Sequence, residues 1–292
     1  MPEALEAHAS PRQSVTSEAP AQALLSRRSK GKGKGKGAGK GKGKSSYGST
    51  TQHAPRQASM ACMHQLRSLE VEEQASLVGE VSAALGFEVV GNRYTVYAPG
   101  KVKVFVAAEE TDLCTRQLKS CFPDCAPWHL SIVYAKDGRI EKAFDLERDW
   151  TCTCCCFNRP RVEVKDSSTG RLIGSITDPW ACFDLTFTIR DARDNTVLKA
   201  AGDCCQCGLC CPLPCGPCSE VNFPIVEERG GREVGHIQKQ VPSCCAFMFV
   251  EDIDNYKIDF AGISNPEWKA LVMGLSIFMD FRYFSSSSAD GN

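Results

Sequence analysis

The stretch "LTFTIRDARDNTVLKAAG", residues 185–202, places two runs of alternating polar and apolar residues around an Asp-rich centre. A period of two is typical of strands that bury one face, and Asp and Asn between such runs favour a turn. The stretch therefore predicts a β-hairpin. The same pattern recurs at residues 93–110 around a Pro-Gly turn, at residues 130–144 around Asp-Gly and at residues 221–241 around Gly-Gly.

Four hairpins with little helix between them predict a mostly β fold that runs as an antiparallel meander. An open meander leaves two strand edges with unpaired backbone groups, and closure into a barrel removes those edges. We therefore expect one closed antiparallel β-barrel domain over residues 61–285. Residues 1–60 and 286–292 are expected to be disordered tails.

Two segments interrupt the two-residue period. A helix is predicted for residues 63–85, where apolar residues recur at roughly helical spacing: Leu66, Leu69, Leu77, Val78 and Val81. A second helix is predicted for residues 266–284, which begin with a proline and are apolar nearly all round from Trp268 to Met279. A helix of this kind lies in protein or in lipid. Its unbroken apolar run reaches only about half of the ~20 residues that a bilayer span needs, which favours a helix buried in protein over a transmembrane one.

Charge is divided unevenly along the chain. The net charge of the 292 residues is −1, yet residues 1–60 hold 11 Lys and Arg against 3 Asp and Glu. Within this tail, Lys30 to Lys44 alternates lysine with glycine, which keeps the segment flexible and extended. Such a segment suits anionic lipid headgroups, nucleic acid or nuclear import, and the alternative is a tail that binds nothing.

The chain contains 18 cysteines. No apolar secretory core opens the sequence, so we expect synthesis in the reducing cytosol, where cysteines serve as thiols, metal ligands or acylation sites. Four of them, Cys152, Cys154, Cys155 and Cys156, lie within five positions beside aromatic and basic residues. This spacing is too dense for a zinc tetrahedron and favours palmitoylation near a membrane. Small apolar residues at a strand end, or a metal or redox role, are the alternatives.

A second cluster has a different spacing. Cys207 and Cys210 form one C-x-x-C pair, and Cys215 and Cys218 form another. Pairs of this kind are typical of structural zinc sites, although the loop between them is short. Acylation, an iron–sulfur cluster or a hairpin tip with reduced thiols are the alternatives.

The sequence contains no pattern typical of an enzyme. Five histidines are scattered, and nucleophile-elbow, HExxH and phosphate-loop motifs are lacking. We therefore expect no covalent chemistry.

Several ordered motifs resemble the phospholipid scramblase family. They are "AAEETDLCTRQ", "CTCCCF", "FTIRDARDNTVLKAAGDCCQC", "EVNFPI", "EVGHIQKQ", "EDIDNYKIDF" and "WKALVMGLSIFMDFRYF". The resemblance covers about residues 65–285. It implies a tubby-like fold, in which a C-terminal hydrophobic helix threads a closed antiparallel barrel. It also implies calcium-stimulated, ATP-independent, bidirectional movement of phospholipids between membrane leaflets, and a membrane-associated protein on the cytosolic face of the plasma membrane.

The same resemblance implies calcium binding in the segment that begins at Glu251. Asp252 and Asp254 match the first two ligand positions of the family, and Asp259 is a further candidate. An EF-hand loop counted from Asp252 would need Gly and a bidentate acid where this chain has Lys257 and Ile263. We therefore predict weak calcium binding. The alternative function is a membrane-tethered or nuclear regulator that binds lipid or nucleic acid and translocates nothing.

Overall fold

The computed structural model describes residues 58–74, 91–122, 124–153, 156–181, 184–211, 213, 215–240 and 255–284. The chain divides into two units between Gln52 and His53, and all of the described residues belong to the second unit. The tail with Lys30 to Lys44 lies outside the described residues.

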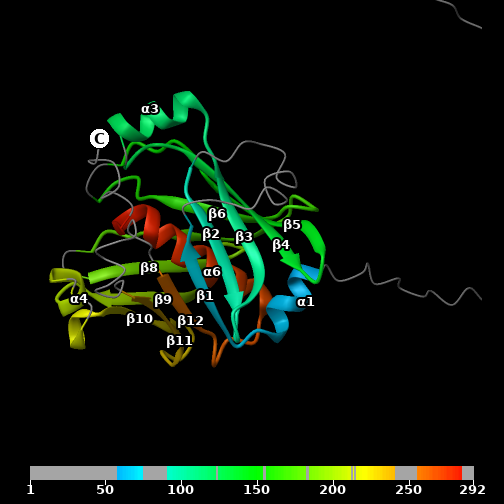
Figure 1. Ribbon diagram of the computed structural model, residues 1–292. Helices are drawn as coiled ribbons and strands as arrows, with labels where there is room; N and C mark the ends of the chain where they lie inside the picture. Colours follow the sequence, from blue (N-terminus) through cyan, green and yellow to red (C-terminus); the bar gives the residue numbers. More distant parts are fainter. Residues whose placement is uncertain are drawn as a thin grey trace, which may run out of the picture. The chain divides into compact units, whose positions relative to one another are not determined.

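Twelve strands of the described residues form one closed antiparallel barrel, in which each strand pairs with the strand that follows it (Figure 1). The strands are β1 (Ser68–Glu73), β2 (Arg93–Ala98), β3 (Val102–Glu110), β4 (Trp128–Lys136), β5 (Arg139–Arg148), β6 (Arg161–Asp166), β7 (Leu172–Thr177), β8 (Asp184–Asp191), β9 (Thr196–Asp203), β10 (Glu220–Glu227), β11 (Glu233–Gln240) and β12 (Asn255–Asp259). The first and last strands pair with Ser68 opposite Asp259, which closes the barrel.

The four predicted hairpins are confirmed as β2–β3, β4–β5, β8–β9 and β10–β11. Their turns use the residues that the sequence offers. In the β4–β5 turn, Asp137 and Gly138 adopt φ values of 55° and 74°, in the left-handed region that Asp and Gly tolerate. The predicted closed barrel is confirmed as well.

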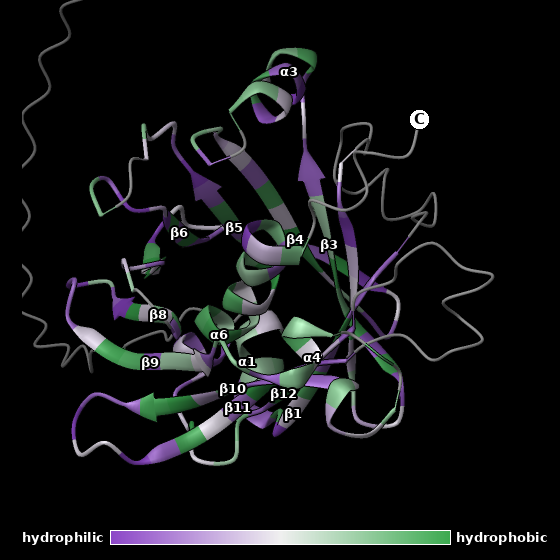
Figure 2. Ribbon diagram, turned by 90° about the vertical axis from the view of Figure 1, so that its left-hand side faces the viewer, coloured by the Kyte–Doolittle hydropathy of each residue, from purple (hydrophilic) through white to green (hydrophobic). Residues whose placement is uncertain are grey.

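The interior of the barrel is filled by helix α6 (Pro266–Met279), and Figure 2 shows it enclosed by the strands. The side chain of Asn265 caps its first turn by accepting a hydrogen bond from the Glu267 amide at 2.9 Å. Every residue from Lys269 to Met279 is buried, so the predicted buried helix is confirmed. Within the described residues, none of the helices combines the length and the apolar character needed to cross a membrane.

The helix predicted for residues 63–85 is wrong in part. Its first three residues are helical, as the end of helix α1 (Ala58–Gln65), whereas residues 68–73 form strand β1. Leu69 and Val71 alternate into the core, and β1 pairs with both β2 and β12. The hydrogen bonds of these two strand pairs stabilise the extended conformation more than the weak helical spacing of apolar residues stabilises a helix. The rest of the predicted helix, from residue 75, lies outside the described residues.

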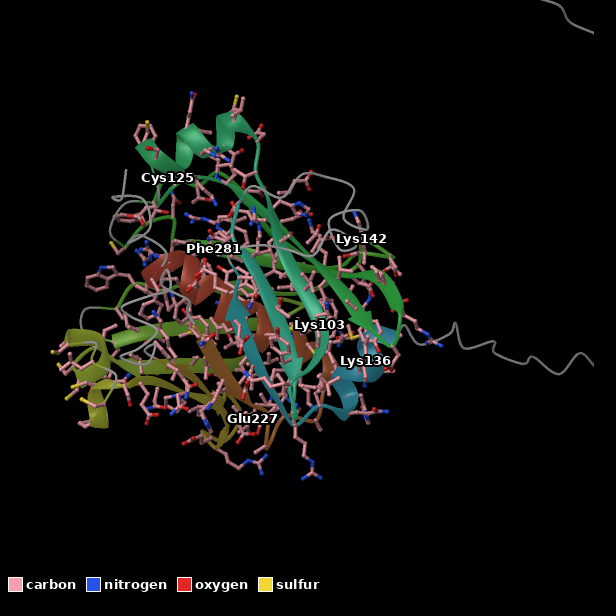
Figure 3. All side chains as sticks on the ribbon, viewed as in Figure 1. Lys103, Cys125, Lys136, Lys142, Glu227 and Phe281 are labelled. Atoms are coloured by element: carbon pink, nitrogen blue, oxygen red, sulfur yellow. The ribbon has the colours of Figure 1, made fainter. Side chains whose placement is uncertain are left out.

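Because antiparallel strands reverse direction, successive connections lie at opposite ends of the barrel. We call one end the tight-turn end; it holds the hairpin turns, helix α1 and the start of α6. The other is the long-loop end. It holds helix α3 (Leu113–Cys121), residues 149–153 and 156–160, residues 178–181, α4 (Cys207–Cys210) and η1 (Gly216–Cys218). In Figure 3, Cys125 lies beside α3 and Lys136 beside α1, at these two ends.

Candidate functional site

The long-loop end is closed by a buried polar cluster just after α6. The π-helical turn η2 (Asp280–Phe284) follows α6, and the Asp280 carboxylate is fully buried. The hydroxyl groups of Tyr94 and Tyr256 donate to its two oxygens at 2.6 Å and 2.8 Å. Burial raises the pKa of Tyr94 well above its usual value, and the Asp280 charge adds to the rise. Tyr94 therefore stays protonated, and its hydroxyl together with that of Tyr256 compensates the buried carboxylate.

A second buried carboxylate ties η2 to the wall of the barrel. Asp178 is 1% exposed and accepts hydrogen bonds from Arg159 at 2.6 Å, from Arg282 at 2.9 Å and from the Tyr283 hydroxyl at 3.2 Å. Burial, with the Asp178 charge next, raises the pKa of Tyr283 to about 12. The end of α6 is thus fixed to residues that flank β6 and β7.

The first cysteine cluster lies in the β5–β6 connection. Cys152 and Cys156 are exposed, and Cys154 and Cys155 lie outside the described residues. The Asn158 side chain donates to the Cys152 carbonyl at 3.3 Å, and the Thr153 hydroxyl donates to the Asn158 carbonyl at 3.0 Å. These bonds hold a loop on which thiols are accessible, as acylation would require.

The second cysteine cluster lies in the β9–β10 connection, at the same end. Cys207, Cys210 and Cys215 are exposed, and Cys218 is half-buried. Among the described residues, the group of three ligand atoms within 4.8 Å of one another is Asp203, Cys204 and Cys205, not these four thiols. Zinc binding by the two C-x-x-C pairs stays a prediction.

The predicted calcium ligands are only partly described. Asp252 and Asp254 lie outside the described residues, which resume at Asn255. Asp259 lies at the other end of β12, about 13 Å along the strand from Asn255 at the usual rise per residue. There its carboxylate accepts the Ala261 amide at 2.9 Å and lies 4.0 Å from His236. The calcium site stays a prediction, and Asp259 already has local partners at the tight-turn end.

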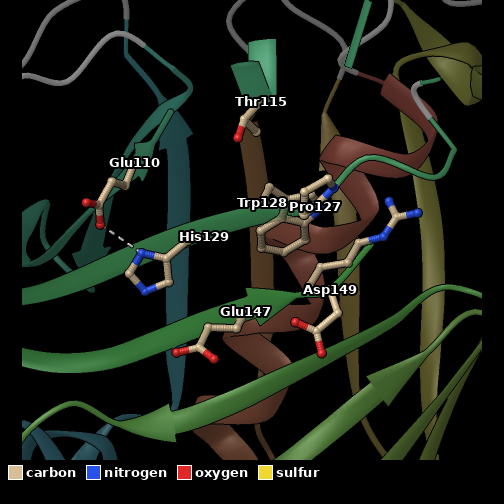
Figure 4. Close-up of a pocket in the computed structure, with 8 residues that line it drawn as sticks. Glu110, Thr115, Pro127, Trp128, His129, Glu147 and Asp149 are labelled. Atoms are coloured by element: carbon tan, nitrogen blue, oxygen red, sulfur yellow. Dashed lines mark hydrogen bonds and ion pairs between the residues drawn. The ribbon is translucent and has the colours of Figure 1, made fainter. Parts of the chain in front are cut away.

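A pocket of about 360 Å³ opens at the long-loop end (Figure 4). Its lining consists of Glu110, Thr115, Pro127, Trp128, His129, Glu147, Arg148 and Asp149. His129 Nδ1 lies 2.9 Å from Glu110, and its Nε2 lies 3.6 Å from Asp145. The contact with Asp145 raises the pKa of His129, burial opposes the rise, and Glu110 adds to it. The carboxylates give this pocket an acidic mouth that suits a cationic group.

Helix α3 is the feature that the sequence reasoning missed. Asp112 caps it by accepting the Thr115 amide at 2.7 Å, and no residue of α3 is buried. The signal in the sequence is Asp112, an N-cap residue type, directly before the apolar Leu113 and soon after a strand.

Comparison with known proteins identifies the family. The model of the Scramblase family matches residues 45–286. The chain is 27% identical to phospholipid scramblase 2 of Bos taurus over 77% of this chain and 71% of that protein. It is 28% identical to phospholipid scramblase 1 of Mus musculus over 75% of this chain and 62% of that protein. It is also 28% identical to phospholipid scramblase 1 of Homo sapiens, over 78% of this chain and 66% of that protein. The chain thus spans less than two thirds of the length of these last two relatives. No solved structure matches the chain significantly. Because the family model covers most of the sequence, the chain belongs to the scramblase family.

Proposed function

We propose that the protein is a phospholipid scramblase that moves phospholipids in both directions between membrane leaflets, stimulated by calcium and without ATP. The observation that carries this proposal is the match of the Scramblase family model to residues 45–286, the part of the chain that holds the whole barrel. Relatives named phospholipid scramblases match over three quarters of the chain.

The filled barrel limits how such a protein moves lipid. Helix α6 occupies the interior, where Leu271, Met273, Leu275 and Phe278 are each 0% exposed. A lipid headgroup therefore has no path along the barrel axis while α6 is in place. The proposed activity consequently uses the outer surface of the barrel, where contact with the bilayer lowers the barrier to headgroup passage.

We place the membrane anchor at Cys152, Cys154, Cys155 and Cys156, as sites of palmitoylation on the cytosolic face of the plasma membrane. One acyl chain binds a membrane only marginally and two or more anchor it stably. The exposure of Cys152 and Cys156 supports this proposal. Replacing all four by serine should release the protein from cell membranes and remove hydroxylamine-sensitive acylation. The matched change of Cys207, Cys210, Cys215 and Cys218 to serine should alter neither, unless that cluster is the acylated one.

The calcium proposal assigns weak binding to Asp252 and Asp254. In vesicles with fluorescent lipid in both leaflets, a quencher added outside reaches only the label of the outer leaflet. The quenched fraction should therefore exceed half of the label only when protein and calcium are present and lipid moves between the leaflets. The Asp252→Ala/Asp254→Ala variant should need more calcium for the same rate, and Asp259→Ala tests the third candidate ligand. The matched control is Glu233→Ala, at an exposed position of β11. Quenching that stays at the outer-leaflet fraction at millimolar calcium would contradict the scramblase proposal.

A regulator that binds lipid or nucleic acid without translocation is the second candidate. The filled interior favours it, because the fold holds a helix where a conduit would lie. The Lys30 to Lys44 tail would then bind anionic lipid headgroups or nucleic acid, with the nucleus as a second location. Salt-sensitive binding that is lost when residues 30–44 are deleted, together with no lipid movement, would favour this candidate. Metal analysis that finds one zinc per chain, lost in Cys207→Ser, would add a structural zinc site.

A further inference from the structure

Helix α3 is amphipathic, and its apolar side faces away from the barrel. Its inward residues are Thr115 and Lys119, which are half-buried, whereas Leu113 is 77% exposed and Leu118 is 36% exposed. At 100° per residue, Leu113, Cys114, Leu118 and Cys121 fall on one arc with Gln117, and this arc holds no charge. Helices on globular proteins normally place their apolar stripe toward the core. The orientation of α3 is the reverse.

The reversed orientation is fixed by specific contacts. Lys119 forms an ion pair with Glu109, which is 2% exposed, and its Nζ lies 4.8 Å from the centre of the Phe281 ring. Phe281 in turn stacks on Trp128, with ring centres 4.7 Å apart. Turning α3 over would break the ion pair and leave Glu109 buried without its cation, which is costly. The outward apolar arc is therefore a property of the folded protein.

Further exposed aromatic side chains lie at the same end. Phe122, the residue that ends α3, meets Trp150 of the β5–β6 connection edge to face, with ring centres 6.0 Å apart. Phe157 of that connection and Trp180 of the β7–β8 connection are 71% and 54% exposed. We call α3 with these four residues the α3 rim. Figure 2 shows α3 projecting beyond the ends of the strands, with hydrophobic segments along it.

We propose that the α3 rim inserts into the interfacial region of a phospholipid bilayer and so sets which end of the barrel faces the membrane. Trp, Phe and Leu on one side of a helix or on loop tips are the side chains that lie at the boundary between headgroups and acyl chains. The rim projects from several separate connections, which suits a flat lipid surface. The uncharged arc on α3 suits a zwitterionic membrane, so this contact should persist in high salt, unlike the contact of a lysine tail.

This inference rests on the proposed function only for the choice of lipid as the partner. It differs from acyl anchoring, because it requires no modification and uses residues outside the Cys152–Cys156 cluster.

The test uses the full unmodified chain and vesicles of pure phosphatidylcholine in 0.5 M salt, where tail electrostatics contribute little. Leu113→Glu/Leu118→Glu should lower vesicle affinity at least about tenfold, equivalent to about 1.4 kcal/mol. The matched control is Val102→Glu/Ile140→Glu, because Val102 and Ile140 are 45% and 43% exposed at the tight-turn end. This control should bind like the unchanged protein. Equal melting temperatures of the two variants would show that both fold.

A second measurement reports the orientation directly. Brominated phosphatidylcholine should quench the fluorescence of Trp150 and Trp180, which lie on the rim. Because Trp128 lies at the same end, the variant Trp128→Phe/Trp150→Phe/Trp180→Phe, which keeps Trp268 alone of the four tryptophans, should remove the quenching. Trp268, half-buried at the tight-turn end, should stay unquenched. Quenching that persists in this triple variant would come from Trp268 at the tight-turn end and would overturn the proposal.

The outcomes separate this inference from the proposed function. If Leu113→Glu/Leu118→Glu binds vesicles like the unchanged protein, the rim is not a membrane surface, whatever the scrambling assay shows. If this variant instead dissociates an oligomer without changing vesicle binding, the rim binds a second copy of the chain and the proposal is overturned. If the unchanged protein docks through the rim and moves no lipid, the inference holds and the scramblase proposal fails.

Discussion

The buried carboxylate at the end of α6 makes a quantitative prediction for Tyr94→Phe. The substitution keeps the ring in the core and removes only the hydroxyl that donates to Asp280 at 2.6 Å. Tyr256 still donates at 2.8 Å, so the variant isolates one hydrogen bond to a buried charge.

The magnitude follows from the setting of that bond. A hydrogen bond to a charged group contributes about 1.5–3 kcal/mol to the free energy of unfolding. Tyr94 and Asp280 are both 0% exposed, so water does not replace the lost donor. We therefore expect Tyr94→Phe to lower the free energy of unfolding by about 2 kcal/mol. For a domain of this size, that loss lowers the melting temperature by about 4–8 °C.

Urea unfolding followed by tryptophan fluorescence measures this change. The control is Tyr283→Phe, whose hydroxyl donates to Asp178 at 3.2 Å in a less buried position. Its cost should be smaller, because Asp178 keeps hydrogen bonds from the charged groups of Arg159 and Arg282 when the tyrosine hydroxyl is removed. If Tyr94→Phe costs no more than Tyr283→Phe, Asp280 is not held as a charge by its tyrosines, and the account of the closed barrel end is wrong.

Three further predictions concern the wall and filling of the barrel. The pKa of His129 is raised in the folded protein above the value of about 6.5 that it has in the unfolded chain. The contacts of His129 therefore stabilise the fold fully at pH below about 6.5, and this stabilisation is lost as the pH rises through the pKa of the folded state. His129→Gln should therefore lower the urea midpoint at about pH 5.5 and leave it nearly unchanged at about pH 9. Gly174→Ala should lower the free energy of unfolding in urea by about 3 kcal/mol, because the added Cβ would lie 2.2 Å from a backbone carbonyl oxygen of β8. The control is Gly274→Ala, which should cost far less because its Cβ would lie 3.3 Å from the nearest atom. Equal costs for the two variants would contradict the packing described. Phe278→Ala should cost about 3–5 kcal/mol in the same assay, because its fully buried ring would leave a cavity inside the barrel, and a loss below about 1 kcal/mol would mean that α6 is not held there.

Much of the fold could be predicted from local signals in the sequence. Alternating residues around Asp-Gly or Gly-Gly determine both a strand pair and its turn, so the four hairpins needed no distant information. Strand β1 was missed because its identity depends on pairing with β12, 191 residues away in the pair of Ser68 with Asp259. A weak helical spacing predicted the wrong element there, since local propensity yields to two long-range ladders.

The candidate site was less predictable, for a related reason. The two cysteine clusters were evident one at a time, but their position at one end follows from the alternation of connections around the whole barrel. The outward arc of α3 depends on the pairing of Lys119 with Glu109 and Phe281, which no local pattern encodes. Sequence periodicity indicates an amphipathic helix without showing which side faces the core.

The order of elements along the chain has a consequence for biosynthesis. The strand that closes the ring and the helix that fills it are made after the other eleven strands of the barrel, and contacts such as Tyr94 with Asp280 join residues 186 positions apart. Folding dominated by such distant contacts is slow. Until α6 is complete, the emerging chain has an unfilled apolar interior and open strand edges, which makes it a target for chaperones and prone to aggregation. A premature stop anywhere before residue 266 should therefore remove the whole domain from the cell rather than yield a shortened barrel.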